Sequence, residues 1–175
     1  MAEGPPRARR RWTPAAHGSR GAARRGRGRT RLSVTLALRF LHLAAALTWA
    51  GGMLFVALVL VPVTRRLDDP ALRRRLMHDT GVRFRAVGWA AISVLVATGL
   101  LNIWVRPELL TLGRFWVKAT LVLVAIGLSA LHDFVLGPRA GRPDAPPSMR
   151  PAASWIARVN LAVVLVVVYL GLSFR

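Results

Sequence analysis

Cysteine is absent from the 175-residue chain. Without thiols the protein has no disulfides and no thiolate metal ligands, so a bound metal must use histidine, methionine, carboxylate or backbone oxygen. Acidic residues are also few, with seven Asp and Glu against 26 Lys and Arg, and Lys118 is the single lysine. Because the arginines flank apolar runs, we expect this positive charge to meet a lipid bilayer with anionic headgroups, and no nucleic acid.

Long apolar runs make up most of the remaining sequence, and 54% of all residues are hydrophobic. The sequence predicts an all-α protein, an integral membrane bundle of four antiparallel transmembrane helices. Each run reaches the length of about 20 residues that a bilayer requires, and short connections make successive helices antiparallel neighbours. The predicted spans are residues 33–63, 86–105, 115–136 and 155–174.

The first 31 residues differ from the rest of the chain. They are mostly Arg, Gly, Ala and Pro and lack the apolar side chains that a core requires. We therefore expect residues 1–31 to form a disordered basic tail and residues 32–175 to form the transmembrane domain. The apolar run after the tail is too long for the h-region of a secretory signal.

Arg39 and His42 are the two ionisable residues inside the first apolar run. At a rise of 1.5 Å per residue, His42 lies about 13 Å below the membrane surface at the amino-terminal end of the first span. An ionisable group at that depth is a functional candidate, although a histidine hydrogen-bonded to another span is the structural alternative. Trp49 lies two turns further on the same helix face, where it either packs in the core or forms the wall of a pocket.

Further polar residues are predicted near the same membrane surface. Asn102 and Lys118 come from neighbouring spans, about 5 Å from the same surface, so these two residues, Arg39 and His42 are expected to form one polar layer. Two alternatives stay open. Arg39 and Lys118 can extend to the headgroups, and Asn102 and Asn160 can hydrogen-bond between helices.

A second group of candidate ligands is predicted near the opposite surface. Met77, His78 and His132 carry thioether and imidazole donors, which suit copper. The predicted depths place His42 and His132 about 12 Å apart along the membrane normal. Two axial nitrogens on one haem iron would be only about 4 Å apart, so this pair is not expected to bind haem together.

Several short motifs follow one another in a recognisable order. They are His42-x6-Trp49-Ala50-Gly51-Gly52, Phe84-Arg85-Ala86-Val87-Gly88-Trp89, Thr98-Gly99-Leu100 and Lys118. Together, over residues 36–174, they resemble the four-helix core of the copper resistance protein D family of bacterial integral membrane proteins. That resemblance implies a multi-pass protein of the bacterial plasma (inner) membrane, associated with copper uptake or tolerance.

A more distant resemblance is to the four-helix membrane protoporphyrinogen oxidases. It rests on a histidine and a downstream tryptophan in the first span and a lysine in the third. This resemblance implies a haem-binding redox enzyme, with His42 as an axial ligand and Lys118 or Arg39 at a propionate.

We predict that the protein handles or transports copper ions across the membrane. His42 is the central candidate ligand, with Trp49 beside it, and Met77, His78 and His132 are secondary ligands. A haem-binding redox enzyme is the alternative, and a structural or assembly subunit without a ligand is a third. Whether the protein is an enzyme, and whether it forms a homo-oligomer, stay open.

Overall fold

Four long helical segments dominate the computed structural model, which describes residues 18–142 and 144–172. The segments long and apolar enough to cross a bilayer are Ser33–Arg65, Pro70–Val105, Gly113–Ala140 and Met149–Gly171. No β-strand occurs in these described residues. The prediction of an all-α protein with four membrane-spanning helices is therefore confirmed.

The chain divides into two units, residues 1–36 and 37–175. In the first unit, helix α1 (Gly18–Phe55) begins at Gly18. Residues 18–31 are thus helical, whereas we expected them to belong to a disordered tail; residues 1–17 lie outside the described residues. Arginine and alanine are strong helix formers, and a helix extends more readily from an existing helix than it nucleates.

The second spanning helix begins much earlier than the predicted residue 86. Helix α3 runs from Pro70 to Val105, so residues 70–85, which precede the predicted span, are also helical. The Asp69 side chain accepts a hydrogen bond from the Ala71 backbone N–H at 2.7 Å. Together with Pro70 at the first helical position, this contact forms a strong helix start.

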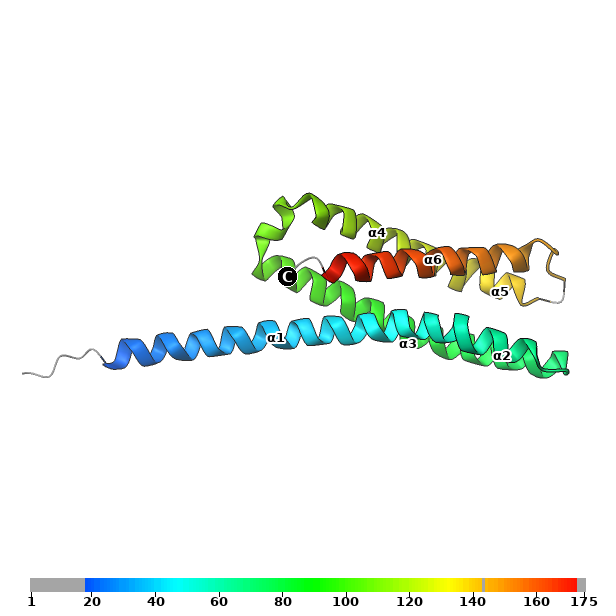
Figure 1. Ribbon diagram of the computed structural model, residues 1–175, viewed down its shortest axis with the longest axis horizontal. Coiled ribbons are helices and arrows are strands. Elements are labelled where there is room, and N and C mark those ends of the chain that lie inside the picture. Colours follow the sequence, from blue (N-terminus) through cyan, green and yellow to red (C-terminus); the bar gives the residue numbers. More distant parts are fainter. Residues whose placement is uncertain (1–17, 143, 173–175) are drawn as a thin grey trace, which may run out of the picture. The chain divides into compact units, whose positions relative to one another are not determined.

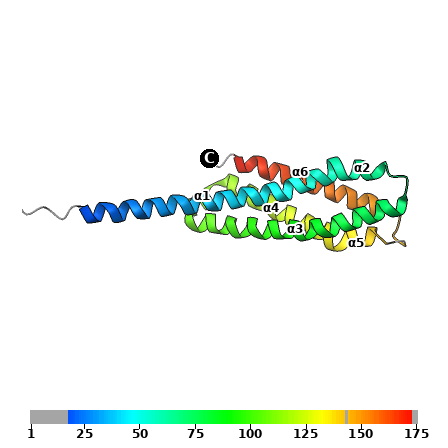
Figure 2. The ribbon, with the colours of Figure 1, turned by 90° about the horizontal axis from the view of Figure 1, so that it is seen from below.

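The bundle has two ends with different connections (Figures 1 and 2). The first span continues from α1 through a π-helix, η1 (Val56–Leu60), and α2 (Val61–Arg65). The third contains α4 (Gly113–Ala130), the π-helix η3 (Leu131–Leu136) and α5 (Gly137–Ala140), and the fourth is α6 (Met149–Leu172). The α2–α3 and α5–α6 connections share one end, here called the loop end. The 3-10 helix η2 (Pro107–Thr111) marks the other, the η2 end.

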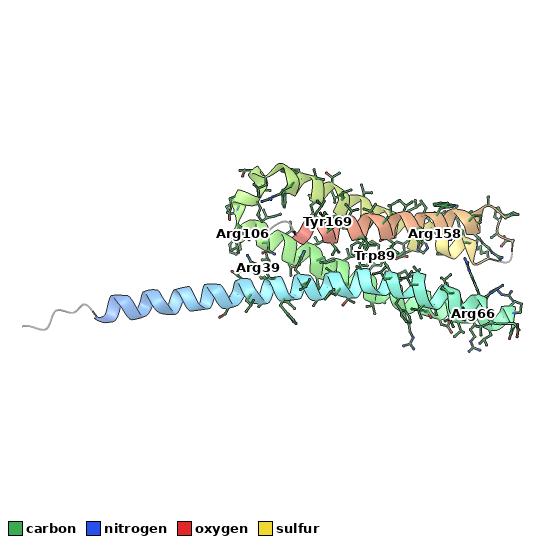
Figure 3. All side chains as sticks on the ribbon, viewed as in Figure 1. Arg39, Arg66, Trp89, Arg106, Arg158 and Tyr169 are labelled. Carbon is green, nitrogen blue, oxygen red and sulfur yellow. The ribbon has the colours of Figure 1, made fainter. Side chains whose placement is uncertain are left out.

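Small side chains dominate the core between the helices. Its buried residues come from α1, α3, α4 and α6: Ala45, Trp49, Ala50, Ala91, Ile92, Ala125 and Val164. Many large apolar side chains instead face outward, as a lipid-facing surface requires; the most exposed include Leu36, Phe40, Trp104, Leu123 and Tyr169. Arg66 and Arg106 lie towards opposite ends of the bundle, with Trp89 between them (Figure 3).

Candidate functional site

His42 is held by a hydrogen bond to the second spanning helix. Its Nδ1 atom lies 2.7 Å from the Thr98 hydroxyl oxygen. The Thr98 hydroxyl also faces the backbone carbonyls of Val94 at 2.7 Å and Leu95 at 3.2 Å. Because a hydroxyl has a single hydrogen, which Thr98 donates to its own helix, its oxygen accepts from the His42 Nδ1–H. The second ring nitrogen, Nε2, then keeps its lone pair and is available as a ligand.

Most of the predicted polar layer comes together around this bond. The Asn102 side-chain amide donates to the backbone carbonyl of Thr98 at 2.9 Å, within its own helix. Lys118 is close enough to His42 for an electrostatic interaction. Its Nζ also lies 3.5 Å from where a Cβ on Gly171 would stand. Arg39, the fourth predicted member, is exposed.

Trp49 is a core residue in this structure. Its side chain is 6% exposed. The Trp49 Cδ1 atom lies 3.9 Å from the position that a Cβ on Gly88 would occupy, so the indole packs closely against α3. Gly88 thus lies beside the Trp49 indole without being required for its space, and the core interpretation accounts for the position of Trp49.

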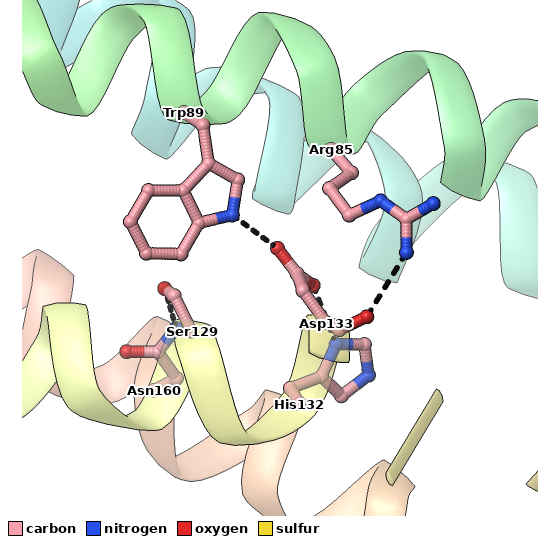
Figure 4. A network of polar contacts seen from close by, with 6 residues as sticks. All are labelled: Arg85, Trp89, Ser129, His132, Asp133 and Asn160. Atoms are coloured by element: carbon pink, nitrogen blue, oxygen red, sulfur yellow. Dashed lines mark hydrogen bonds and ion pairs between the residues drawn. The ribbon is translucent and has the colours of Figure 1, made fainter. Parts of the chain in front are cut away.

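His132 belongs to a polar network nearer the loop end (Figure 4). Its Nδ1 atom lies 3.0 Å from Oδ1 of Asp133. The other carboxylate oxygen of Asp133 accepts a hydrogen bond from Trp89 Nε1 at 3.1 Å. Because an ionised carboxylate only accepts, His132 donates its Nδ1–H, and in the neutral ring Nε2 has a lone pair.

The local backbone explains why α3 contacts this segment. In η3 the Gly137 N–H bonds the carbonyl of His132, five residues earlier. A Cβ on Gly137 would lie 2.9 Å from that carbonyl oxygen, so glycine permits the tight turn. The Asp133 carbonyl then loses its α-helical donor, and Pro138, the next residue, has no N–H to replace it. Arg85 supplies the missing donor from α3, with Nη1 3.1 Å from the Asp133 oxygen.

Asn160 connects α6 to α4 in the middle of the bundle. Its amide nitrogen donates to the Ser129 hydroxyl at 2.8 Å, which confirms the predicted interhelical hydrogen bond. Asn160 is 3% exposed. Its Oδ1 atom has no hydrogen-bond partner among the described residues. Figure 4 shows this pair below the Trp89 ring, to the left of Asp133.

The remaining predicted ligands are not gathered into one site. The Met77 sulfur accepts a hydrogen bond from the Thr64 hydroxyl at 3.6 Å, and His78 is exposed. Nowhere in residues 18–142 and 144–172 do three His, Cys, Asp or Glu side chains come together as a metal site. The roles of Met77, His78 and His132 as ligands therefore stay predictions.

The contacts of His42 and His132 indicate two separate sites. Thr98 bonds His42, and Trp89 bonds the carboxylate beside His132. These two α3 residues are nine positions apart, which corresponds to about 13 Å of helical rise. Sequence reasoning identified both histidines but missed Thr98 as the partner of His42. It also missed Arg85 and Trp89 as the residues that hold Asp133 beside His132. The proline and glycine after His132 were the available signal, since both perturb a helix.

Comparisons with known proteins show to which family this chain belongs. The family model for copper resistance protein D matches residues 79–174. A protein of Aquifex aeolicus (strain VF5), described as uncharacterized, is 33% identical over 142 residues, which cover 78% of this chain and 92% of that protein. No solved structure matches the chain. The resemblance to protoporphyrinogen oxidases is not tested by these matches and stays a prediction. The family model covers more than half of the chain, which therefore belongs to the copper resistance protein D family of membrane proteins.

Proposed function

We propose that the protein binds copper ions at His42, inside the bundle, and passes them across the bacterial plasma membrane. One observation carries this proposal: the His42 Nδ1 atom lies 2.7 Å from the Thr98 hydroxyl oxygen. In the neutral tautomer that donates this bond from Nδ1, Nε2 has a lone pair. Membership of the copper resistance protein D family supports copper as the ion. Four helices that can span a bilayer support a role in passage rather than storage.

The chemistry of the site suits an ion in transit. Imidazole is a good copper ligand, and a hydrogen bond on the other ring nitrogen fixes both the tautomer and the orientation of the ring. A site with one imidazole donor binds less tightly than a closed cage. An ion that must cross the membrane has to bind and then leave, so a site of this kind favours passage.

Copper content tests this function directly. We would purify the protein in detergent and measure copper by elemental analysis in the wild type, His42→Ala and Thr48→Ala. Thr48 is an exposed polar residue on the same helix and is the matched control. We expect His42→Ala to lose its copper and Thr48→Ala to keep it. Unchanged copper in His42→Ala would overturn the proposal.

A haem-binding redox enzyme is a second candidate, favoured by the position of Lys118. A lysine in electrostatic contact with His42 would repel a copper cation and attract a carboxylate. The residues fit haem in part: His42 offers one axial nitrogen, and Lys118 would meet a propionate. When bound, haem would supply an iron centre for electron transfer.

Substitution of Lys118 separates the two candidates. Under the copper proposal, Lys118→Met should raise copper content, because it removes a nearby positive charge. Under the haem alternative, it should lower haem content, read as a smaller Soret band. A protein without copper or haem, in which His42→Ala only lowers the melting temperature, would instead support a structural subunit.

A further inference from the structure

We propose that His132 is a second copper-binding position, oriented by Asp133 and located nearer the loop end than His42. This inference rests on the proposed copper function and extends it from one ligand to two successive positions. It assigns Asp133, Trp89 and Arg85 as positioning residues, which act on copper only through His132.

The two histidines are anchored through the same ring nitrogen. His42 uses Nδ1 on the Thr98 hydroxyl at 2.7 Å, and His132 uses Nδ1 on the Asp133 carboxylate at 3.0 Å. In the neutral Nδ1–H tautomer of either ring, Nε2 has a lone pair that can bind a metal. A histidine whose Nδ1–H is bonded to a carboxylate is a frequent arrangement in metal sites, because the carboxylate increases the basicity of the ligand.

Asp133 is itself fixed from two sides. Trp89 donates to its second carboxylate oxygen at 3.1 Å, and Arg85 donates to its backbone carbonyl at 3.1 Å. Figure 4 shows both donors reaching Asp133 from α3. The carboxylate is therefore held in place before any ion binds, which is the condition for a defined ligand geometry.

His132 is also open enough to receive an ion. Its side chain is 36% exposed and that of Asp133 is 24% exposed. The α3 contacts of the two histidine positions are about 13 Å apart along the helix axis. The apolar residues Trp49, Ala91 and Ile92 belong to the core of the same bundle. Copper would thus occupy two distinct positions rather than one site bound by both histidines.

The experiment uses the full-length chain with only two histidines left. The chain has four, so His17→Gln and His78→Gln give a background that keeps His42 and His132. Copper(I) is titrated anaerobically against a chromophoric copper(I) chelator, which reports stoichiometry and affinity. We expect two copper(I) ions per protein in this background and one after either His42→Ala or His132→Ala.

Asp133→Asn tests the orienting role. It keeps the size of the side chain but removes its charge, so copper(I) affinity at the His132 position should fall by about 10- to 100-fold while the His42 position is unchanged. Asp144→Asn, at an exposed aspartate, should change neither. If Asp133→Asn does not insert, Trp89→Phe provides a milder test, because it removes one donor to Asp133 and should weaken only the His132 position.

The outcomes separate this inference from the proposed function. Loss of one ion in His42→Ala, with no change in His132→Ala, would overturn the second position and keep the first. Loss of one ion only in His132→Ala would support the second position and overturn binding at His42. No copper(I) binding in the two-histidine background would overturn both. Equal affinities in Asp133→Asn and in the background would overturn the orienting role of Asp133.

Discussion

The two histidines of this bundle are anchored alike but supported differently. His42 donates to a neutral hydroxyl on α3, Thr98, which is held by its own helix. His132 donates to a carboxylate on the adjacent residue, and that carboxylate is held by two side chains from α3. The first anchor needs one partner residue, and the second needs three.

This difference shows how a membrane protein can position a polar group at two depths. Inside the apolar core, a hydroxyl bonded to its own helix carries no charge and costs little to bury. Nearer the surface, the Asp133 carboxylate is stabilised by hydrogen bonds with His132 and Trp89, and its side chain stays 24% exposed. The η3 π-helix supplies the carbonyl that Arg85 contacts, so a local irregularity in one helix becomes a fixed contact with another.

The largest loss of stability should come from adding a methyl group at Gly137, in the tight turn at the His132 site. In Gly137→Ala the new methyl group would lie 2.9 Å from the His132 carbonyl oxygen, a backbone atom that cannot move cheaply. We expect the free energy of unfolding to fall by about 3 kcal/mol, measured by denaturation in detergent. Gly127→Ala is the control on the same span, because nothing lies within 4 Å of its new Cβ. Equal stability of the two variants would mean that η3 does not depend on glycine.

The contrast between the two anchors should appear as a difference in stability. Asp133→Ala removes the acceptor of two donors, those of His132 and Trp89, and should lower the free energy of unfolding by about 2 kcal/mol. Thr98→Val removes the acceptor of the His42 donor alone and should lower the free energy of unfolding by about 1 kcal/mol. Thermal melting of both variants in one detergent measures the difference. A larger loss in Thr98→Val would reverse the ranking of the two sites.

The sequence predicted the four spans because their apolar runs are long and contain few ionisable residues. It predicted the wrong start for α3, although Asp69 and Pro70 form a strong start signal, because the arginines that follow resemble a loop. From helical rise alone it predicted that His42, Asn102 and Lys118 lie near the same membrane surface and belong to one polar layer. The sequence could not predict the contact between Trp89 and Asp133, because this contact depends on how α3 and the third span are rotated relative to each other.

A smaller loss of stability is expected at Arg85, and its size should depend on Pro138, the proline after η3. Arg85→Met leaves the Asp133 carbonyl without its donor and should cost about 1 kcal/mol in free energy of unfolding. In a Pro138→Ala background the backbone regains an N–H that can bond this carbonyl, so the same substitution should cost about half as much. A double-mutant cycle from denaturation curves measures the coupling. Additive effects would show that Arg85 acts elsewhere, for example on the Phe134 ring 5.9 Å away.

The smallest effect should come from Gly88→Ala, next to Trp89 on the helix that supports both sites. The new Cβ would lie 3.9 Å from Trp49 Cδ1, an ordinary van der Waals distance, so neither residue has to move. Alanine also favours the helix over glycine by up to about 1 kcal/mol, and we expect a stability equal to the wild type or slightly above it. Because Trp49 is buried in the core, copper and haem content should not change either. A loss of bound copper or haem at unchanged stability would show that the Trp49 indole must move or line a pocket, and would make it a binding residue of the His42 site.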